Sequence, residues 1–192
     1  MLISGRGSNM CALIEATRNL EFSAEIALVL SDRPDAAGLR AAREAGVPAE
    51  AVDFRRFQAK GEFEAAIQAR LASDRVELVC LAGFMRILSP SFVERWRGRM
   101  LNIHPSLLPD LRGLHTHERA LAEGRREHGC TVHYVSAELD AGPTIAQSRV
   151  PIVAGDDAEA LAARVLVEEH RIYPLALDAV ARALRRADPA TV

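Results

Sequence analysis

The chain has 192 residues, which is within the usual size of one domain and enough to bury a sizeable core. Its composition, 49% hydrophobic and 26% charged, is ordinary for a globular protein, and a net charge of -2 without runs of like charge argues against nucleic acid as the main partner. No apolar stretch approaches the roughly 20 residues that span a bilayer and the N-terminus lacks a signal-peptide pattern, so we expect a cytoplasmic protein that binds no membrane.

In the first half of the chain, apolar runs alternate with amphipathic stretches, which predicts an α/β fold with a largely parallel sheet. The predicted strand at residues 76–82 is continuous and apolar, as central parallel strands are. The first predicted strand, at residues 1–4, is short. Strands are predicted at residues 1–4, 25–30, 47–53 and 76–82, and helices at residues 9–19, 36–45 and 62–72.

The second half begins with a helix for which Ser89 is a suitable N-cap and Pro90 a suitable first residue, and which Gly98 ends. The last two strands are close enough in sequence to pair antiparallel. A long final helix is expected to bend before Pro174. Strands are predicted at residues 99–103, 131–136 and 144–151, and helices at residues 90–98, near 115–122 and from about 157 onward.

The cysteines and the minor histidines predict no metal site and no disulfide. Cys11, Cys80 and Cys130 are odd in number and have no Cys-x-x-Cys neighbour, so we expect free, buried thiols. His115 and His117 are two residues apart and do not share a helix face, and no acidic cluster completes a site. His133, in an apolar strand, is either a core histidine or a supporting group of a site.

A glycine-rich turn, Gly5-Arg6-Gly7-Ser8-Asn9, follows the first predicted strand. Glycines let the backbone turn tightly, and the helix that follows offers free amides and the positive end of its dipole. This combination favours a phosphate monoester. A dinucleotide fold would have a glycine where this chain has Met10, which weakens that interpretation of the turn. The remaining interpretation is a purely structural turn.

Two polar residues, Asn102 and His104, stand at the carboxyl end of the fifth predicted strand, where open α/β sheets bind ligands. Side chains alternate along an extended chain, so the amide and the imidazole point to the same side. The alternative interpretation is a strand end capped by polar residues.

Asp140 lies in the turn before Gly142-Pro143. Most aspartates in such turns only hydrogen-bond the turn backbone. Near His104, the same carboxylate would favour a charged imidazolium, which then donates to a developing oxyanion, and it could accept a proton from an attacking amine.

Six segments occur in order along the chain: Leu2-Ile3-Ser4-Gly5-Arg6-Gly7-Ser8-Asn9, Leu81-Ala82-Gly83-Phe84-Met85-Arg86-Ile87-Leu88-Ser89, Leu101-Asn102-Ile103-His104-Pro105-Ser106-Leu107-Leu108-Pro109, Gly113-Leu114-His115-Thr116-His117, Leu139-Asp140-Ala141-Gly142-Pro143 and Glu169-His170-Arg171-Ile172-Tyr173-Pro174. Together they resemble the phosphoribosylglycinamide formyltransferase family of purine synthesis. Single motifs of this length arise by chance, whereas six in register do not.

The resemblance implies an α/β, single-domain, Rossmann-like formyltransferase fold over residues 1–192. A mostly parallel central sheet with an antiparallel C-terminal part would carry helices on both faces. The N-terminal half would bind the ribonucleotide and the C-terminal half the folate, with a cleft between. The implied enzyme transfers the formyl group of the co-substrate 10-formyltetrahydrofolate to the amine of glycinamide ribonucleotide in de novo purine biosynthesis. It would act without metal, as a monomer or homodimer.

The resemblance also implies roles for particular residues. Direct attack by the amine would form a tetrahedral intermediate, to whose oxygen Asn102 and protonated His104 donate. Asp140 would keep His104 charged and assist proton transfer to the leaving folate nitrogen. The ribonucleotide would be bound by Gly7, Ser8, Asn9, Gly83 and Glu169, and the folate by Met85, Arg86, Ile87, Leu88, Asn102, Ala137, Glu138, Leu139 and Asp140.

The chain departs from the family pattern at two places. Family members carry more residues before the Leu-Ile-Ser-Gly run, so either the first strand is truncated, which is expected to lower stability, or the sequence begins too late. Lys60 stands where the family offers a basic residue to the folate tail, but this region aligns loosely and Lys60 is left out of the site.

Other functions are less compatible with the sequence. Methionyl-transfer-RNA formyltransferase shares the Ser-Leu-Leu-Pro region but needs an additional C-terminal domain, and formyltetrahydrofolate hydrolase has an extra N-terminal regulatory domain. The glycine-rich turn favours a phosphate-bearing acceptor over water. A non-catalytic binding module has no need of Asn102, His104 and Asp140 together, and Met10 weakens a nicotinamide oxidoreductase.

Overall fold

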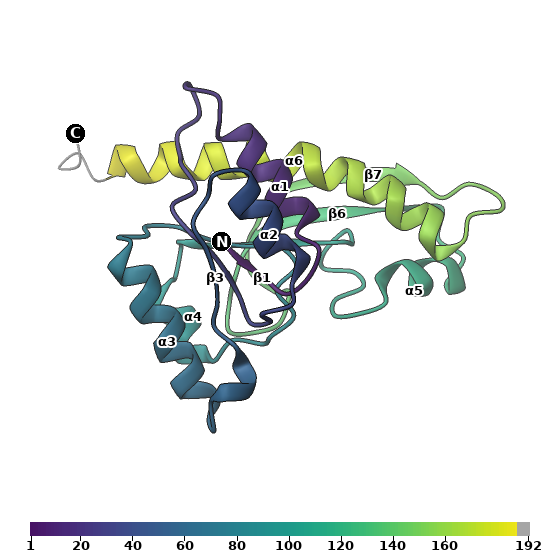
Figure 1. Ribbon diagram of the computed structural model, residues 1–192. Helices are drawn as coiled ribbons and strands as arrows, with labels where there is room; N and C mark the ends of the chain where they lie inside the picture. The colour runs from purple at the N-terminus through teal and green to yellow at the C-terminus, as the bar shows by residue number, and fades with distance from the viewer. Residues whose placement is uncertain (188–192) are drawn as a thin grey trace.

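A computed structural model describes residues 1–187 of the protein. Strands and helices alternate through most of the chain (Figure 1). The strands are β1 (Leu2–Ile3), β2 (Val29–Ser31), β3 (Ala49–Ala51), β4 (Val79–Leu81), β5 (Met100–His104), β6 (Glu127–Tyr134) and β7 (Thr144–Pro151). The helices are α1 (Ser8–Ala16), α2 (Ala37–Glu44), the short 3-10 helix η1 (Phe54–Arg56), α3 (Lys60–Ser73), α4 (Pro90–Arg95), α5 (Thr116–Ala122) and α6 (Ala158–Ala187).

All seven described strands form one sheet in the order β3-β2-β1-β4-β5-β6-β7. The first five strands along the chain pair in parallel, β6 is antiparallel to β5, and β7 is antiparallel to β6. The prediction of a mostly parallel sheet with an antiparallel C-terminal part is therefore confirmed. The strand order reverses between β1 and β4, and ligands of open α/β sheets bind beside such a reversal.

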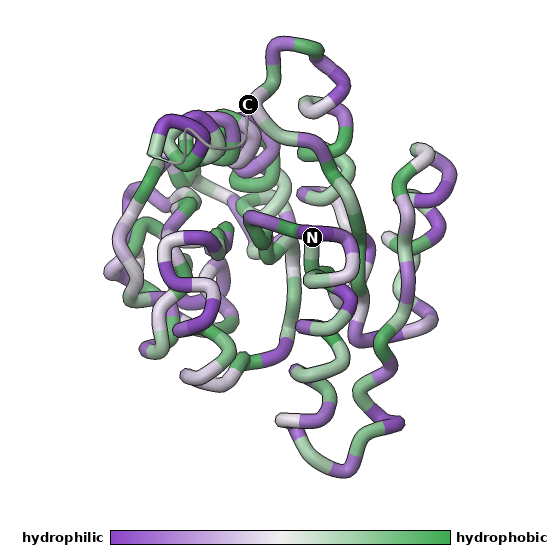
Figure 2. The backbone as a smooth tube through the Cα atoms, turned by 90° about the vertical axis from the view of Figure 1, so that its left-hand side faces the viewer, coloured by the Kyte–Doolittle hydropathy of each residue, from purple (hydrophilic) through white to green (hydrophobic). Residues whose placement is uncertain are grey.

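Helices cover both faces of the sheet because neighbouring strand residues point in opposite directions. Ile3 faces a core cluster that includes side chains of α1, α2 and α6. Its neighbour Leu2 faces a second cluster, to which α3 and α4 contribute. In Figure 2, hydrophobic and hydrophilic residues alternate around the helical coils, as expected for helices that bury one side only.

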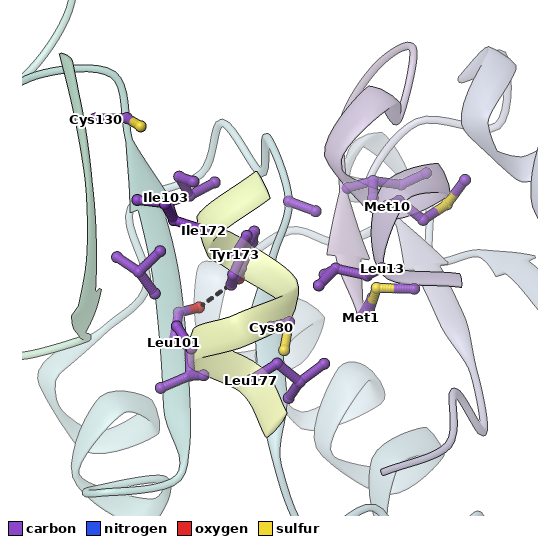
Figure 3. Close-up of a cluster of buried hydrophobic side chains, with 14 of the residues drawn as sticks. Met1, Met10, Leu13, Cys80, Leu101, Ile103, Cys130, Ile172, Tyr173 and Leu177 are labelled. Atoms are coloured by element: carbon purple, nitrogen blue, oxygen red, sulfur yellow. Dashed lines mark hydrogen bonds between the residues drawn. The ribbon is translucent and has the colours of Figure 1, made fainter. Parts of the chain in front are cut away.

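The long helix α6 is fixed to the sheet by a buried tyrosine. The Tyr173 hydroxyl donates to the carbonyl oxygens of Leu81, at 3.0 Å, and Leu101, at 3.3 Å, and so contacts both β4 and β5. Figure 3 shows the bond to Leu101. Pro174 lies inside the helix, and Figure 1 shows the two halves of α6 running in different directions, in agreement with the predicted bend. No helix within residues 1–187 is both long and apolar enough to cross a membrane.

Three expectations from the sequence need correction. The second strand begins at Val29 rather than at residue 25, because its neighbour β1 offers only two residues for pairing. Strand β5 continues through His104, so this histidine lies in the sheet and not in the following loop. Cys11 is exposed, because α1 directs Met10, Leu13 and Ile14 toward the core, whereas Cys80 and Cys130 are buried as predicted.

Candidate active site

The centre of the candidate site lies where β5 pairs with β6. Asn102 and His104 are two residues apart on β5, and Asn102 stands opposite His133 of β6. The amide Nδ2 of Asn102 is 3.2 Å from His133 Nε2. Both histidines are buried. The alternation of side chains along β5 therefore brings an amide and two imidazoles together.

Asp140 joins this group from the loop that connects β6 and β7. Its Oδ2 lies 3.4 Å from His104 Nδ1, and its Oδ1 lies 3.8 Å from His133 Nε2. The backbone amide of Gly113 also donates to Oδ2, at 3.0 Å. Asp140 has a φ of 48°, in the left-handed region that aspartate and asparagine tolerate better than most residues. One buried carboxylate thus faces two imidazole rings.

His133 orients Asn102. The Nδ1 of His133 is 2.9 Å from the carbonyl oxygen of Tyr134, to which it can only donate, so Nε2 is left to accept from the amide of Asn102. Burial lowers the pKa of His133, which agrees with this neutral form. One N–H of the Asn102 amide is used by His133, and the other is available to a ligand.

The other nitrogen of His104 contacts the loop after β5. Nε2 lies 3.0 Å from the carbonyl oxygen of Leu111, so Nε2 carries a proton in this arrangement. Leu111 has a φ of 53°, which is uncommon for a leucine. In the described conformation, both ring nitrogens of His104 therefore face protein groups.

The glycine-rich turn after β1 leads directly into α1. Gly7 has a φ of 77° and is the N-cap residue, and Ser8 and Asn9 form the first turn of the helix. Asn9 Nδ2 donates to Glu169 Oε2 at 2.7 Å, which connects this turn to α6. Burial raises the pKa of Glu169, and the bond from Asn9 opposes that shift. Asn9 Oδ1 is buried and has no hydrogen-bond partner among residues 1–187.

The segment after β4 is held beside the turn after β1. Ser4 N donates to the Gly83 carbonyl at 3.0 Å, and Met85 N donates to Ser4 Oγ at 2.8 Å. Leu81, two residues before Gly83, pairs with Asn102 across the sheet. The glycine-rich turn and the Gly83 loop therefore follow two neighbouring strands, and Asn102 lies on the strand beside them.

A pocket of about 310 Å³ opens against this segment. Four of its lining residues, Met85, Arg86, Ile87 and Leu88, are among the nine expected to contact folate, and the other five do not line it. The other lining residues come from η1 and α3 and were not in the predicted site: Phe54, Lys60, Phe63 and Glu64. Lys60, left out because its region aligned loosely, thus lies on the same pocket as the predicted residues.

The loop of residues 137–140 closes one side of the site. Glu138 accepts from Arg112 Nη1 at 2.6 Å, and its carbonyl accepts from Ser136 Oγ at 2.9 Å. Leu139 exposes about half of its side chain. Ala137 belongs to this loop and makes none of these side-chain bonds. Of the four predicted residues in this loop, only Asp140 therefore lies beside the two imidazoles.

A second pair of histidines lies outside this centre. His117 Nδ1 and His128 Nε2 are 3.2 Å apart, and burial lowers the pKa of His117 and lowers that of His128 to about 4. No group of three or more His, Cys, Asp or Glu side chains within residues 1–187 is placed to hold a metal ion. The pair is explained by packing between α5 and β6.

The fold and the clustered polar groups agree with the family assignment. The family model described as "Formyl transferase" matches residues 1–177, and the chain belongs to this family. The phosphoribosylglycinamide formyltransferase of Escherichia coli is 45% identical over 177 residues, a match that covers 92% of this chain and 84% of the bacterial enzyme. The resemblance inferred from the six segments is thereby confirmed.

A solved structure and a longer relative extend the comparison. The crystal structure of phosphoribosylglycinamide formyltransferase from Brucella melitensis is 51% identical, covers 94% of this chain and 93% of its own, and superimposes with a TM-score of 0.90. The human trifunctional purine biosynthetic protein adenosine-3 is 48% identical over 181 residues, or 94% of this chain. The chain spans only 18% of the length of that human protein.

Proposed function

We propose that the protein transfers the formyl group of 10-formyltetrahydrofolate to the amine of glycinamide ribonucleotide. The observation that carries this proposal is the meeting of Asn102 and His104 of β5 with Asp140 of the β6–β7 loop, while the segment that follows the neighbouring strand β4 lines the pocket. The 45% identity to the enzyme of Escherichia coli, over 84% of that enzyme's length, supports the choice of acceptor. The chain would act as one unit over residues 1–192, in the cytoplasm, as a monomer or homodimer.

The turn after β1 is the proposed phosphate site. The amides of Gly7, Ser8 and Asn9 stand at the N-terminus of α1, where the helix dipole favours a negative charge. Asn9 Oδ1, buried and unpartnered among the described residues, suits a donor group of the ligand. Glu169, fixed by Asn9, would accept from the ribose hydroxyls or the glycinamide end, and Gly83 would line the path to Asn102.

The pocket beside β4 fits the donor. Met85 and Ile87 are exposed apolar side chains, which suit the flat rings of a folate. Arg86 and Lys60 bring positive charge to the same pocket, which suits the carboxylates of a folate tail. The loop with Ala137, Glu138, Leu139 and Asp140 would close over the pterin, with Leu88 and Asn102 on the opposite wall.

The reaction follows from groups that this chain holds in place. The acceptor amine bonds to the formyl carbon, the bond from that carbon to the donor nitrogen breaks, and one proton passes from the amine to the departing nitrogen. The free N–H of Asn102 and a charged His104 ring donate to the formyl oxygen as it gains negative charge. Asp140 stabilises the positive charge on His104 and assists the proton transfer.

The contact between His104 and Leu111 restricts how the His104 ring can hydrogen-bond to substrate. A ring N–H of His104 cannot donate fully to substrate while Nε2 donates to the carbonyl of Leu111. The loop after β5 would therefore shift, or share that proton, when substrate binds. In the described conformation Nδ1 is directed at Asp140.

Formyl transfer is measured by the absorbance of the deformylated folate released from a 10-formylfolate donor, with and without glycinamide ribonucleotide. Release that requires the ribonucleotide is the expected result. Donor breakdown at the same rate without acceptor would point to hydrolysis instead. No release by the folded protein under either condition would contradict the proposal.

A further inference from the structure

A buried carboxylate behind the pocket has no role in the reaction described above. Asp32 follows β2, and its side chain is only 2% exposed. Its Oδ2 accepts from Arg86 Nε at 2.8 Å, whereas its Oδ1 is buried and has no hydrogen-bond partner among residues 1–187. A buried carboxylate is costly unless it is paired. Asp32 therefore depends on Arg86, which is 54 positions further along the chain.

The pairing fixes Arg86 in a particular orientation. Asp32 binds the guanidinium from its side, through Nε, and the ring of Phe54 lies under the same guanidinium, with Cζ 4.0 Å from the ring centroid. Phe54 is itself tied to Asp32, because its amide donates to the Asp32 carbonyl at 3.2 Å. Neither terminal nitrogen of Arg86 bonds another described residue. Both remain available to a carboxylate in the pocket, in the fork geometry that arginine offers.

The second cation of the pocket is arranged in the same way. Lys60 is 45% exposed and lies 3.9 Å from Glu64, whose side chain is only 7% exposed. Arg86 is likewise 40% exposed beside its buried partner. Glu64 is held in turn by the amide and hydroxyl of Ser89, with the amide at 2.6 Å. Both cations line the pocket, as does Glu64, whereas Asp32 lies behind Arg86 and does not line it. The formal charges of these four side chains sum to zero.

We propose that Asp32 is a positioning residue for the donor: it holds Arg86 ready to bind a carboxylate of the folate tail, and so makes the enzyme select donors that carry one. The inference rests on the proposed function. An arginine held before binding loses less conformational freedom when the tail binds. Asp32 contributes through Arg86 alone and contacts neither the formyl group nor the acceptor.

The test compares two donors on the full chain. One is a 10-formylfolate with its glutamate tail, and the other is the corresponding 10-formylpteroate, which lacks the glutamate. Asp32→Ala should raise the KM of the tailed donor about tenfold, the effect of immobilising one long side chain, and leave kcat unchanged. The KM of the tail-less donor should stay within about twofold, since Arg86 has no carboxylate to bind there.

Asp32→Asn is the matched variant. Its amide oxygen can still accept from Arg86 Nε, so the orientation is kept while one negative charge is removed from the pocket. We expect a KM for the tailed donor that is equal to the wild-type value or lower, and that rises more steeply with salt because the pocket is then positive. This variant also keeps the proposal testable if Asp32→Ala does not fold.

A double-mutant cycle separates positioning from a general structural role. In an Arg86→Leu background, Asp32→Ala should have no further effect on the KM of the tailed donor. An equal rise in KM for both donors, or a full effect of Asp32→Ala without Arg86, would overturn the proposal. So would a rise in the tailed-donor KM for Asp32→Asn as large as that for Asp32→Ala. Failure of the proposed function would look different, because the wild-type protein would then transfer the formyl group from neither donor.

Discussion

Asp140→Asn removes one negative charge from a place where two imidazole rings face the same carboxylate. The substitution preserves the shape of the side chain, an acceptor for the amide of Gly113, and a residue type that tolerates the φ of 48°. The change is therefore almost purely electrostatic. Any loss of turnover reports on the charge of Asp140 and not on a collapsed loop.

The size of the effect follows from the geometry. Unit charges 3.4 Å apart, the distance from Asp140 to His104, attract by about 5 kcal/mol at an effective dielectric constant of about 20. Desolvation of the buried pair offsets part of this attraction. We expect about 3 to 4 kcal/mol to be lost from the transition state, which lowers kcat roughly 100- to 1000-fold. The KM values should change little, because the charge acts mainly after both substrates are bound.

The assay is the absorbance-monitored transfer from the 10-formylfolate donor to glycinamide ribonucleotide. Asp110→Asn is the matched control, because the exposed Asp110 carboxylate pairs with Arg125 and contacts neither imidazole. The control should keep kcat within about twofold of wild type, as surface ion pairs contribute little. A folded Asp140→Asn variant with a kcat within about threefold of wild type would refute the electrostatic role assigned to Asp140.

Three further predictions concern the loop, the acid stability and the anchor of α6. Gly142→Ala would place a Cβ against the carbonyl oxygen of Tyr134 and displace the loop that carries Asp140, so we expect kcat to fall about a hundredfold; wild-type kcat would contradict this. Burial lowers the pKa of His128 from 6.5 to about 4, so between these pH values the unfolded chain binds a proton that the folded chain does not. The contribution of His128 to the free energy of unfolding therefore falls as pH drops below 6.5, by about 2 kcal/mol at pH 5. Urea titrations at pH 7 and pH 5 should show a smaller fall in the free energy of unfolding for His128→Gln than for wild type. Tyr173→Phe removes a donor to the Leu81 carbonyl and should lower the urea-derived free energy of unfolding by about 1 to 2 kcal/mol; an unchanged value would mean that packing alone anchors the helix.

Much of the fold could be predicted from local patterns. The α4 helix begins where Ser89 and Pro90 predict, and the Ser89 hydroxyl accepts from the amide of Phe92 as an N-cap should. The antiparallel pairing of β6 with β7 followed from their closeness in sequence. Strand ends were predicted less well, because the length of β2 depends on how much of β1 is present to pair with it.

The candidate site could be predicted in part. Asn102 and His104 were found because a period of two puts them on one side of a strand end, and this geometry is local. Asp140 was placed with them by family resemblance, since an aspartate in a turn usually serves the turn itself. The role of His133 was left open. Its sequence context is apolar, and only the pairing of β5 with β6 puts it opposite Asn102.

The sequence by itself determined the α/β class, the order of the elements and the residue types at the strand ends, because periodicity, capping and turn chemistry act over a few neighbouring residues. The tertiary structure decided which of these residues meet. Asp32 and Arg86 are adjacent because β2 and β4 flank β1 in the sheet, and His104 faces Asp140 because the β6–β7 loop folds back over β5. Such contacts depend on strand order and on loop closure over long stretches of chain, which no local pattern encodes.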